Sequence, residues 1–198
     1  MKKISLNENW KYAHIGEDDY KEVVLQHDAM LSEKRTEGSP GGKNTGYFEG
    51  RDYIYERVLK LDKKEGGRYV LEFEGVYRNA RVYLNGEEIA FRPYGYIGFY
   101  VDITDKALSG ENKLEVKAFN ADQPNSRWYS GAGIYRPVWL YELPEKHIEI
   151  NGVRVRTLDY TTGKISVSVA TSHGGAVKAE VLNGETVVAS GKGEEEIV

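Results

Sequence analysis

The segment YVLEFEGVYRNARVYLNG, residues 69–86, determines the fold class that this sequence predicts. Apolar residues occupy every second position of 69–73 and again of 80–84, the period of two that is typical of strands burying one face. Asn85-Gly86 follows the second run directly, and both residues tolerate the positive φ angles of a type I′ turn. The segment therefore predicts sheet strands and a hairpin.

Further strand patterns lie on the C-terminal side of this segment. The stretch 102–108 offers cap residues ahead of a single helical turn, which Gly110 would end. No long amphipathic helix is predicted, so we expect an all-β protein. The additional strand-like runs cover 97–103, 114–118, 138–141, 153–155, 165–169 and 177–181.

The distribution of aromatic side chains divides the chain of 198 residues. Of 23 aromatic residues, 22 lie in residues 1–143, and Tyr160 is the remaining one. Pro144 cannot donate to a sheet ladder, and charged residues follow it, so we place a domain boundary there. We predict a sandwich over 1–143 and the start of an immunoglobulin-like sandwich over 144–198, since a complete one needs about seven strands in roughly 100 residues. We expect the chain to be part of a longer polypeptide.

Composition excludes several classes of function. The 27 Lys and Arg against 31 Asp and Glu give a formal charge of −4, which does not favour nucleic acid as a partner. No apolar run approaches the roughly 20 residues of a membrane helix. The chain has no cysteine, and its four histidines lack metal-ligand spacing, so we expect no metal and no cofactor. The N-terminus lacks the apolar stretch of a secretory signal, and we therefore expect a cytoplasmic protein.

Two other motifs suggest chemistry that their context does not support. The glycine-rich stretch 38–46 lacks the spacing of a phosphate-binding loop, because Glu37 and Asn44 occupy positions that need Gly and Ser or Thr. We predict a mobile surface loop there. His27-Asp28 could be a base and its orienting partner, but neighbouring side chains of an extended segment point to opposite faces, which favours a structural or loop role.

The stretch 122–139 combines amide, guanidinium, hydroxyl and aromatic side chains in a glycine-punctuated loop. Such a mixture binds sugars, because amide and guanidinium groups can hydrogen-bond two neighbouring hydroxyls of a sugar while aromatic rings cover its apolar C–H faces. The alternative is that Trp128 and Tyr129 close the end of the sandwich while Arg127 and Arg136 form structural ion pairs. The residue types alone leave both interpretations open.

The order of these residues is similar to that in a known family. RWYSGAGIYRPVWL, residues 127–140, resembles the signature that ends the N-terminal sugar-binding domain of glycoside hydrolase family 2, which includes β-galactosidases, β-glucuronidases and β-mannosidases. The resemblance covers residues 1–143, and 144–198 resembles the opening of the family's immunoglobulin-like second domain. Further matching motifs lie at 6–11, 53–57, 73–80, 82–86 and 100–104.

The resemblance implies a jelly-roll, galactose-binding-like sandwich, then part of an immunoglobulin-like sandwich, and then a (β/α)₈ barrel that carries both catalytic glutamates. Retaining hydrolysis needs two carboxyl groups about 5–5.5 Å apart. No carboxylate pair among these 198 residues has a context that fits this role, since Glu87-Glu88 flank a hairpin. We predict no catalytic residue in this chain and no hydrolysis by the chain alone.

The resemblance also implies substrate contacts from two loops. Asn44 takes the place of a family Asn that binds the sugar, and a family Asp that often precedes the signature Trp is replaced here by Asn125-Ser126-Arg127. Asp122 could substitute for that Asp if the loop folds back, and Arg127 would suit an acidic or heavily hydroxylated substrate. The predicted substrate-binding residues are Asn44, Asp122, Asn125, Arg127 and Trp128.

The sequence thus predicts a non-catalytic, sugar-binding and scaffold portion of a retaining family 2 glycoside hydrolase, of β-galactosidase type. Its expected partners are a carbohydrate, the catalytic barrel of the same polypeptide and a second copy in a homo-oligomer. Two alternatives stay open: an autonomous carbohydrate-binding module, and a domain that serves mainly as an oligomerisation surface.

Overall fold

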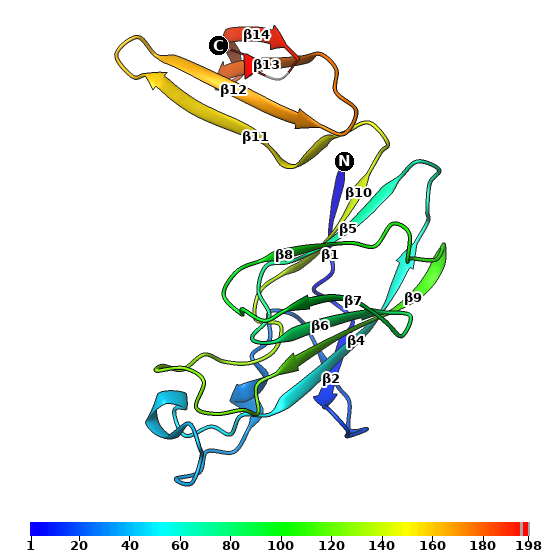
Figure 1. Cartoon of the computed structure of the whole chain (residues 1–198), viewed down its shortest axis with the longest axis vertical. Coiled ribbons are helices and arrows are strands. Elements are labelled where there is room, and N and C mark those ends of the chain that lie inside the picture. Colours follow the sequence, from blue (N-terminus) through cyan, green and yellow to red (C-terminus); the bar gives the residue numbers. More distant parts are fainter. Residues whose placement is uncertain (195, 198) are drawn as a thin grey trace. The chain divides into compact units, whose positions relative to one another are not determined.

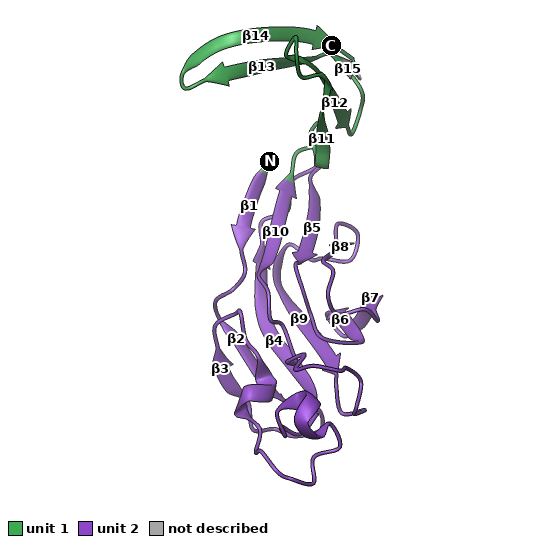
Figure 2. Ribbon diagram, turned by 90° about the vertical axis from the view of Figure 1, so that its left-hand side faces the viewer, with its two compact units in different colours: residues 1, 143–198 green, residues 2–142 purple. Residues whose placement is uncertain are grey.

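The computed structural model of the chain describes residues 1–194, 196 and 197. Its residues form two compact units, residues 2–142 and residues 143–198 together with Met1 (Figure 2). Nearly all regular structure is β-strand (Figure 1), which confirms the predicted fold class. The described part of the chain contains no helix long and apolar enough to cross a membrane.

The larger unit contains two antiparallel sheets that form a jelly-roll sandwich. The four-stranded sheet has the order β1 (Lys2–Ser5), β10 (Val138–Leu143), β5 (Arg68–Phe73) and β8 (Phe99–Asp102). The six-stranded sheet has the order β3 (Lys21–Val23), β2 (Trp10–His14), β4 (Asp52–Leu61), β9 (Gly110–Phe119), β6 (Ala80–Leu84) and β7 (Glu87–Arg92). Strands that are distant in the sequence are therefore neighbours in both sheets.

One hydrophobic core takes side chains from both sheets. Tyr53 and Tyr55 of β4 are fully buried, and Phe73 of β5 stacks on Phe99 of β8 with ring centroids 5.1 Å apart. Burial of such rings removes large apolar areas from water, which is the dominant favourable term in folding. The aromatic residues that mark the first part of the sequence are thus the main filling of this sandwich.

The hairpin predicted at Asn85-Gly86 is confirmed. The φ angles are 52° at Asn85 and 86° at Gly86, and the two residues connect β6 to β7. A type I′ turn, with positive φ at both positions, matches the right-handed twist of two adjacent strands, which explains why this dipeptide is a strong local signal.

The single helical turn predicted within 102–108 is confirmed: the N–H groups of Lys106 and Ala107 both donate to the carbonyl of Ile103, at 3.1 and 2.8 Å. Asp102 accepts hydrogen bonds from the backbone and hydroxyl of Thr104, as a cap residue does, and one turn follows. The buried side chain of Asn112 ends this turn because its amide pairs with both the N–H and the carbonyl of Leu108, at 2.8 and 2.9 Å. A side-chain contact between residues four positions apart therefore accompanies the end of the predicted turn.

Two short 3₁₀ helices lie in the connection between β3 and β4: η1 (Ala29–Ser32) and η2 (Gly42–Thr45). The stretch 38–46, predicted as a mobile surface loop, contains the turn η2. Ser39 and Thr45 are buried, and both hydroxyls donate to the carbonyl of Phe48, at 2.7 and 3.1 Å. These bonds hold the glycine-rich stretch against the sandwich.

The smaller unit consists of two antiparallel sheets. One sheet has the order β11 (Ile148–Asp159), β12 (Lys164–Thr171) and β15 (Glu196–Ile197), and the other pairs β13 (Val177–Asn183) with β14 (Thr186–Gly193). Val153, Val155 and Val188 are each at least half exposed, so a large part of the apolar surface of this unit is uncovered.

Candidate functional site

The segment after β9 is supported from within by Asn120, a fully buried amide. Its Nδ2 donates to the carbonyl of Gly131, and its Oδ1 accepts from the side chains of Gln123 and Asn125 at 3.2 and 2.9 Å. Asp52 at the start of β4 accepts from the backbone N–H of Asn120 at 2.8 Å. Buried polar groups are costly unless they are paired, so this network specifies one conformation of the loop.

Asn125, predicted to bind substrate, is a structural part of this network. Its Nδ2 donates to Asn120 Oδ1 and to the carbonyl of Asp122, and its Oδ1 accepts from the phenol of Tyr77 at 3.1 Å. Both amide protons are therefore used inside the protein, and one lone pair of Oδ1 is left for a ligand.

The other three predicted residues of this loop project into solvent. The Asp122 side chain is 96% exposed, with Arg78 Nη2 at 3.8 Å as its ion-pair partner. Trp128 is 60% exposed, and its indole Nε1 donates to the phenol of Tyr96 at 3.0 Å. Arg127 is exposed, and within the described residues it has no ion-pair partner. Of the structural alternative, the ion pair expected for Arg127 is therefore not found in the described residues, and Trp128 is not buried.

Asn44 lies on the second helical turn, η2, and is half-buried. In the part of the chain that the structure describes, its side-chain amide makes no hydrogen bond. The turn around it is fixed by the Thr45 hydroxyl and by Arg35, whose Nε donates to the carbonyl of Gly46 at 2.8 Å. A fixed backbone that carries an unpaired amide is suited to hydrogen-bond a polar ligand.

Tyr129 joins this turn to the 122–130 loop. Its ring contacts the ring of Phe48 with centroids 6.0 Å apart, and its phenol donates to Asp28 Oδ2 at 2.7 Å. Burial and this bond to a carboxylate raise the pKa of Tyr129 well above its usual range. The two predicted substrate loops, although about 80 positions apart, therefore lie together at one end of the sandwich (Figure 1).

Asp28 is the residue of this site whose importance the sequence interpretation missed. Its Oδ1 caps η1 by accepting from the N–H of Met30 and also accepts from the N–H of Ala132, at 3.1 and 2.9 Å. Gly131, at φ 68°, lies so close that an added Cβ would meet the Asp28 carboxylate. An acidic residue ahead of a short helix is a recognisable cap signal, but its second set of contacts comes from a distant segment.

His27 points to a different neighbour. Its Nδ1 lies 2.8 Å from the phenol of Tyr55, and burial lowers its pKa. Because His27 and Asp28 have separate partners, they do not form a base with its orienting carboxylate, in agreement with the structural role that the sequence favours.

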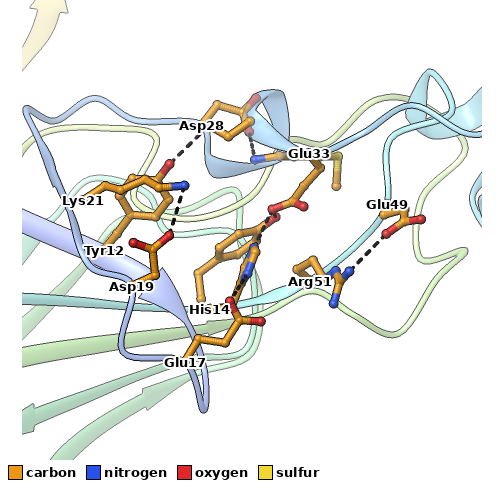
Figure 3. Close-up of polar contacts among 12 residues, drawn as sticks. Tyr12, His14, Glu17, Asp19, Lys21, Asp28, Glu33, Glu49 and Arg51 are labelled. Atoms are coloured by element: carbon orange, nitrogen blue, oxygen red, sulfur yellow. Dashed lines mark hydrogen bonds and ion pairs between the residues drawn. The ribbon is translucent and has the colours of Figure 1, made fainter.

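A second polar cluster surrounds His14 on β2 (Figure 3). Its Nε2 lies 2.7 Å from Glu33 and its Nδ1 lies 3.1 Å from Glu17, and Tyr53 donates to the same oxygen of Glu33. Partial burial alone would lower the pKa of His14, but hydrogen bonds to the two carboxylates raise it. Among residues 1–194, 196 and 197, no group of three His, Cys, Asp or Glu side chains could hold a metal ion.

The fold and the loop arrangement define a galactose-binding-like domain of the glycosidase type. A family model described as the glycosyl hydrolase 2 galactose-binding domain-like matches residues 28–163. The chain therefore belongs to glycoside hydrolase family 2, which confirms the resemblance noted in the sequence.

Relatives that are similar in sequence are much longer proteins. The β-galactosidase BoGH2A of Bacteroides ovatus is 35% identical over 179 residues, which is 84% of this chain and 21% of that protein. A protein named putative β-glucuronidase of Formosa agariphila is 29% identical over 199 residues, 95% of this chain and 19% of that protein. The chain thus spans about a fifth of the length of these relatives.

Solved structures share the fold. A β-glycosidase from Bacteroides vulgatus aligns with a TM-score of 0.89 and 23% identity, over all of this chain and 29% of its own. A family 2 member from Bacteroides cellulosilyticus aligns with a TM-score of 0.85 and 26% identity, over all of this chain and 28% of its own.

Proposed function

We propose that this chain is the non-catalytic, sugar-binding and scaffold portion of a retaining family 2 glycoside hydrolase. One observation carries the proposal: Tyr129 holds the turn of Asn44 and the loop of Trp128 together through Phe48 and Asp28. Two loops of polar and aromatic side chains that are held side by side can form one edge of a sugar site.

In this proposal the chain positions a sugar and the reacting groups come from elsewhere. Asn44 would hydrogen-bond a hydroxyl, Trp128 would cover a C–H face of the ring, and Asp122 and Arg127 would reach further hydroxyls at the solvent edge. Holding a substrate in the reactive orientation and excluding water lower the barrier without any charge transfer by these residues. The two carboxyl groups that retaining hydrolysis requires would belong to a barrel that continues the polypeptide.

The proposed sugar is a β-galactoside. The support is that the relative from Bacteroides ovatus is a β-galactosidase, with higher identity than the putative β-glucuronidase of Formosa agariphila. The exposed Arg127 would also suit a carboxylate, so the test must compare galactosides with glucuronides.

Calorimetric titration of the 198-residue chain with methyl β-galactoside and methyl β-glucuronide tests the proposal. We expect weak binding, with Kd on the order of 1 mM, because an incomplete pocket desolvates only part of the ligand. Asn44→Ala should weaken galactoside binding by about fivefold or more, since it removes a hydrogen bond to the ligand. Asn183→Ala, an exposed amide on the smaller unit, is the matched control and should bind as the parent does. Equal binding by both variants would contradict the proposed role of Asn44.

The coding sequence tests the proposal that this chain belongs to a larger hydrolase. Reading the coding sequence beyond codon 198 should reveal a (β/α)₈ barrel with two catalytic glutamates. A stop codon directly after Val198 would contradict the assignment to a larger hydrolase and would favour an autonomous carbohydrate-binding module.

A further inference from the structure

The loop between β7 and β8 carries aromatic rings that the proposed function does not use. Tyr94 is 56% exposed and Ile97 is 50% exposed, and both lie in the stretch 93–97. Trp128, from the proposed sugar loop, contacts this stretch through its hydrogen bond to Tyr96. Exposed aromatic side chains of two separate loops therefore meet at this place.

The rings are held in fixed orientations. Tyr96 is the centre: its ring lies 5.2 Å from that of Tyr77 and 5.7 Å from that of Tyr94, with an edge-to-face angle of 66° for the second pair. The backbone of the loop is fixed as well, because the phenol of Tyr135 donates to the carbonyl of Gly95 at 2.8 Å. A Cβ at Gly95 would collide with the ring of Tyr77, so only glycine allows this approach.

Neighbouring side chains of the 122–130 loop face two different groups of partners. Tyr129 contacts Phe48 and Asp28, whereas Trp128 contacts Tyr96. The loop thus connects the turn of Asn44 with the aromatic stretch 93–97, and a ligand that extends past Trp128 would next meet Tyr96, whose ring contacts that of Tyr94.

The chemistry of this surface suits a saccharide. Tyrosine and tryptophan offer flat apolar faces together with polar edges, which match the alternating C–H faces and hydroxyls of a pyranose. Rigid rings also bind at a low cost in conformational entropy.

We propose that Tyr94, Tyr96 and Trp128 form a stacking surface for a second sugar unit, so that the site accepts an oligosaccharide and not a single sugar alone. This inference rests on the proposed sugar-binding function. It adds the length of the ligand and two residues, Tyr94 and Tyr96, that neither the signature motif nor the predicted site contains.

Nuclear magnetic resonance of the ¹⁵N-labelled 198-residue chain tests the inference. The chain has three tryptophans and hence three indole N–H signals, of which Trp128→Phe identifies that of Trp128. Titration with galactose and with β-1,4-galactotetraose should show tighter binding of the tetrasaccharide, by about fivefold, which corresponds to about 1 kcal/mol. The Trp128 indole signal should shift with the tetrasaccharide.

Variants test whether the tighter binding of the tetrasaccharide depends on the aromatic surface. Tyr94→Ala should remove the difference between the two ligands, while Tyr94→Phe, which keeps the ring, should retain it. Tyr160→Ala replaces a tyrosine that is 87% exposed on the smaller unit and should behave as the parent does. A tetrasaccharide advantage that survives Tyr94→Ala in a folded variant would overturn the inference.

The remaining outcomes separate this inference from the proposed function. If galactose shifts the amides near Asn44 but the tetrasaccharide binds no more tightly, the stacking surface is excluded and the sugar-binding function stands. If neither saccharide shifts any signal, the proposed function fails and the inference fails with it. If the Trp128 signal moves with protein concentration and not with saccharide, the surface is a contact between copies of the chain and the inference is overturned.

Discussion

The phenol of Tyr129 donates a 2.7 Å hydrogen bond to Asp28, although 101 positions separate the two residues in the sequence. The same carboxylate accepts from the backbone N–H groups of Met30 and Ala132. The Asp28 side chain therefore fixes the start of η1 and the backbone of Ala132 in the signature segment 127–140. It also fixes the ring of Tyr129, which contacts Phe48.

Replacement of Asp28 should loosen this whole end of the sandwich. Asp28→Ala removes a helix cap and leaves a phenol and a backbone N–H without their acceptor, so we expect a loss of about 2–4 kcal/mol in the free energy of unfolding. Tyr129→Phe removes only the phenol bond and should cost about 1 kcal/mol. Urea denaturation measures both losses. An Asp28→Ala protein as stable as the parent would contradict the role given to this carboxylate.

Asn120 should be equally important for the conformation of the loop. Because its amide is fully buried and pairs with Gly131, Gln123 and Asn125, we expect Asn120→Ala to cost about 2–3 kcal/mol. Amide hydrogen exchange should increase over residues 121–131 and stay unchanged in β4 and β9. Protection over 121–131 equal to that of the parent would show that the loop does not depend on this residue.

His14 should make stability depend on pH. The pKa of His14 is raised in the folded chain by the carboxylates of Glu33 and Glu17, so folding is favoured by protonation. This stabilisation is fully present below the ordinary histidine pKa of about 6.5 and is lost as the pH rises through the higher folded value. The stability difference between the parent and His14→Gln should therefore be larger at pH 5.5 than at pH 9. A constant difference across this range would contradict the charged state of His14.

The predicted domain boundary gives a further test. We expect residues 1–143 to fold without the rest of the chain, because their core takes its side chains from β1 to β10. This piece holds 22 of the 23 aromatic residues, so its near-ultraviolet circular dichroism per mole of protein should match that of the whole chain. Loss of that signal would place the boundary elsewhere.

Local patterns account for what the sequence predicted well. The alternation at 69–73 and 80–84 and the positive φ angles of Asn85 and Gly86 depend on neighbours within a few residues, and the strands and the hairpin formed as expected. The signature at 127–140 identified the family because its order of residue types is long and specific.

Long-range contacts account for what the sequence could not predict. The role of Asp28 depends on Tyr129, and the hydrogen-bonding capacity of Asn125 is largely consumed by Asn120 and Tyr77. No pattern within a short window contains these partners, so the geometry of the site required the fold.

One titration tests the central claim, that this chain binds a sugar at its paired loops and does not cleave it. A ¹⁵N-labelled sample is titrated with p-nitrophenyl β-galactoside, and protein and ligand signals are followed together. We predict shifts concentrated at residues 44–48 and 122–130, a Kd on the order of 1 mM, and no free galactose or nitrophenol with time. Absence of shifts at both loops, or steady accumulation of the hydrolysis products, would contradict the account.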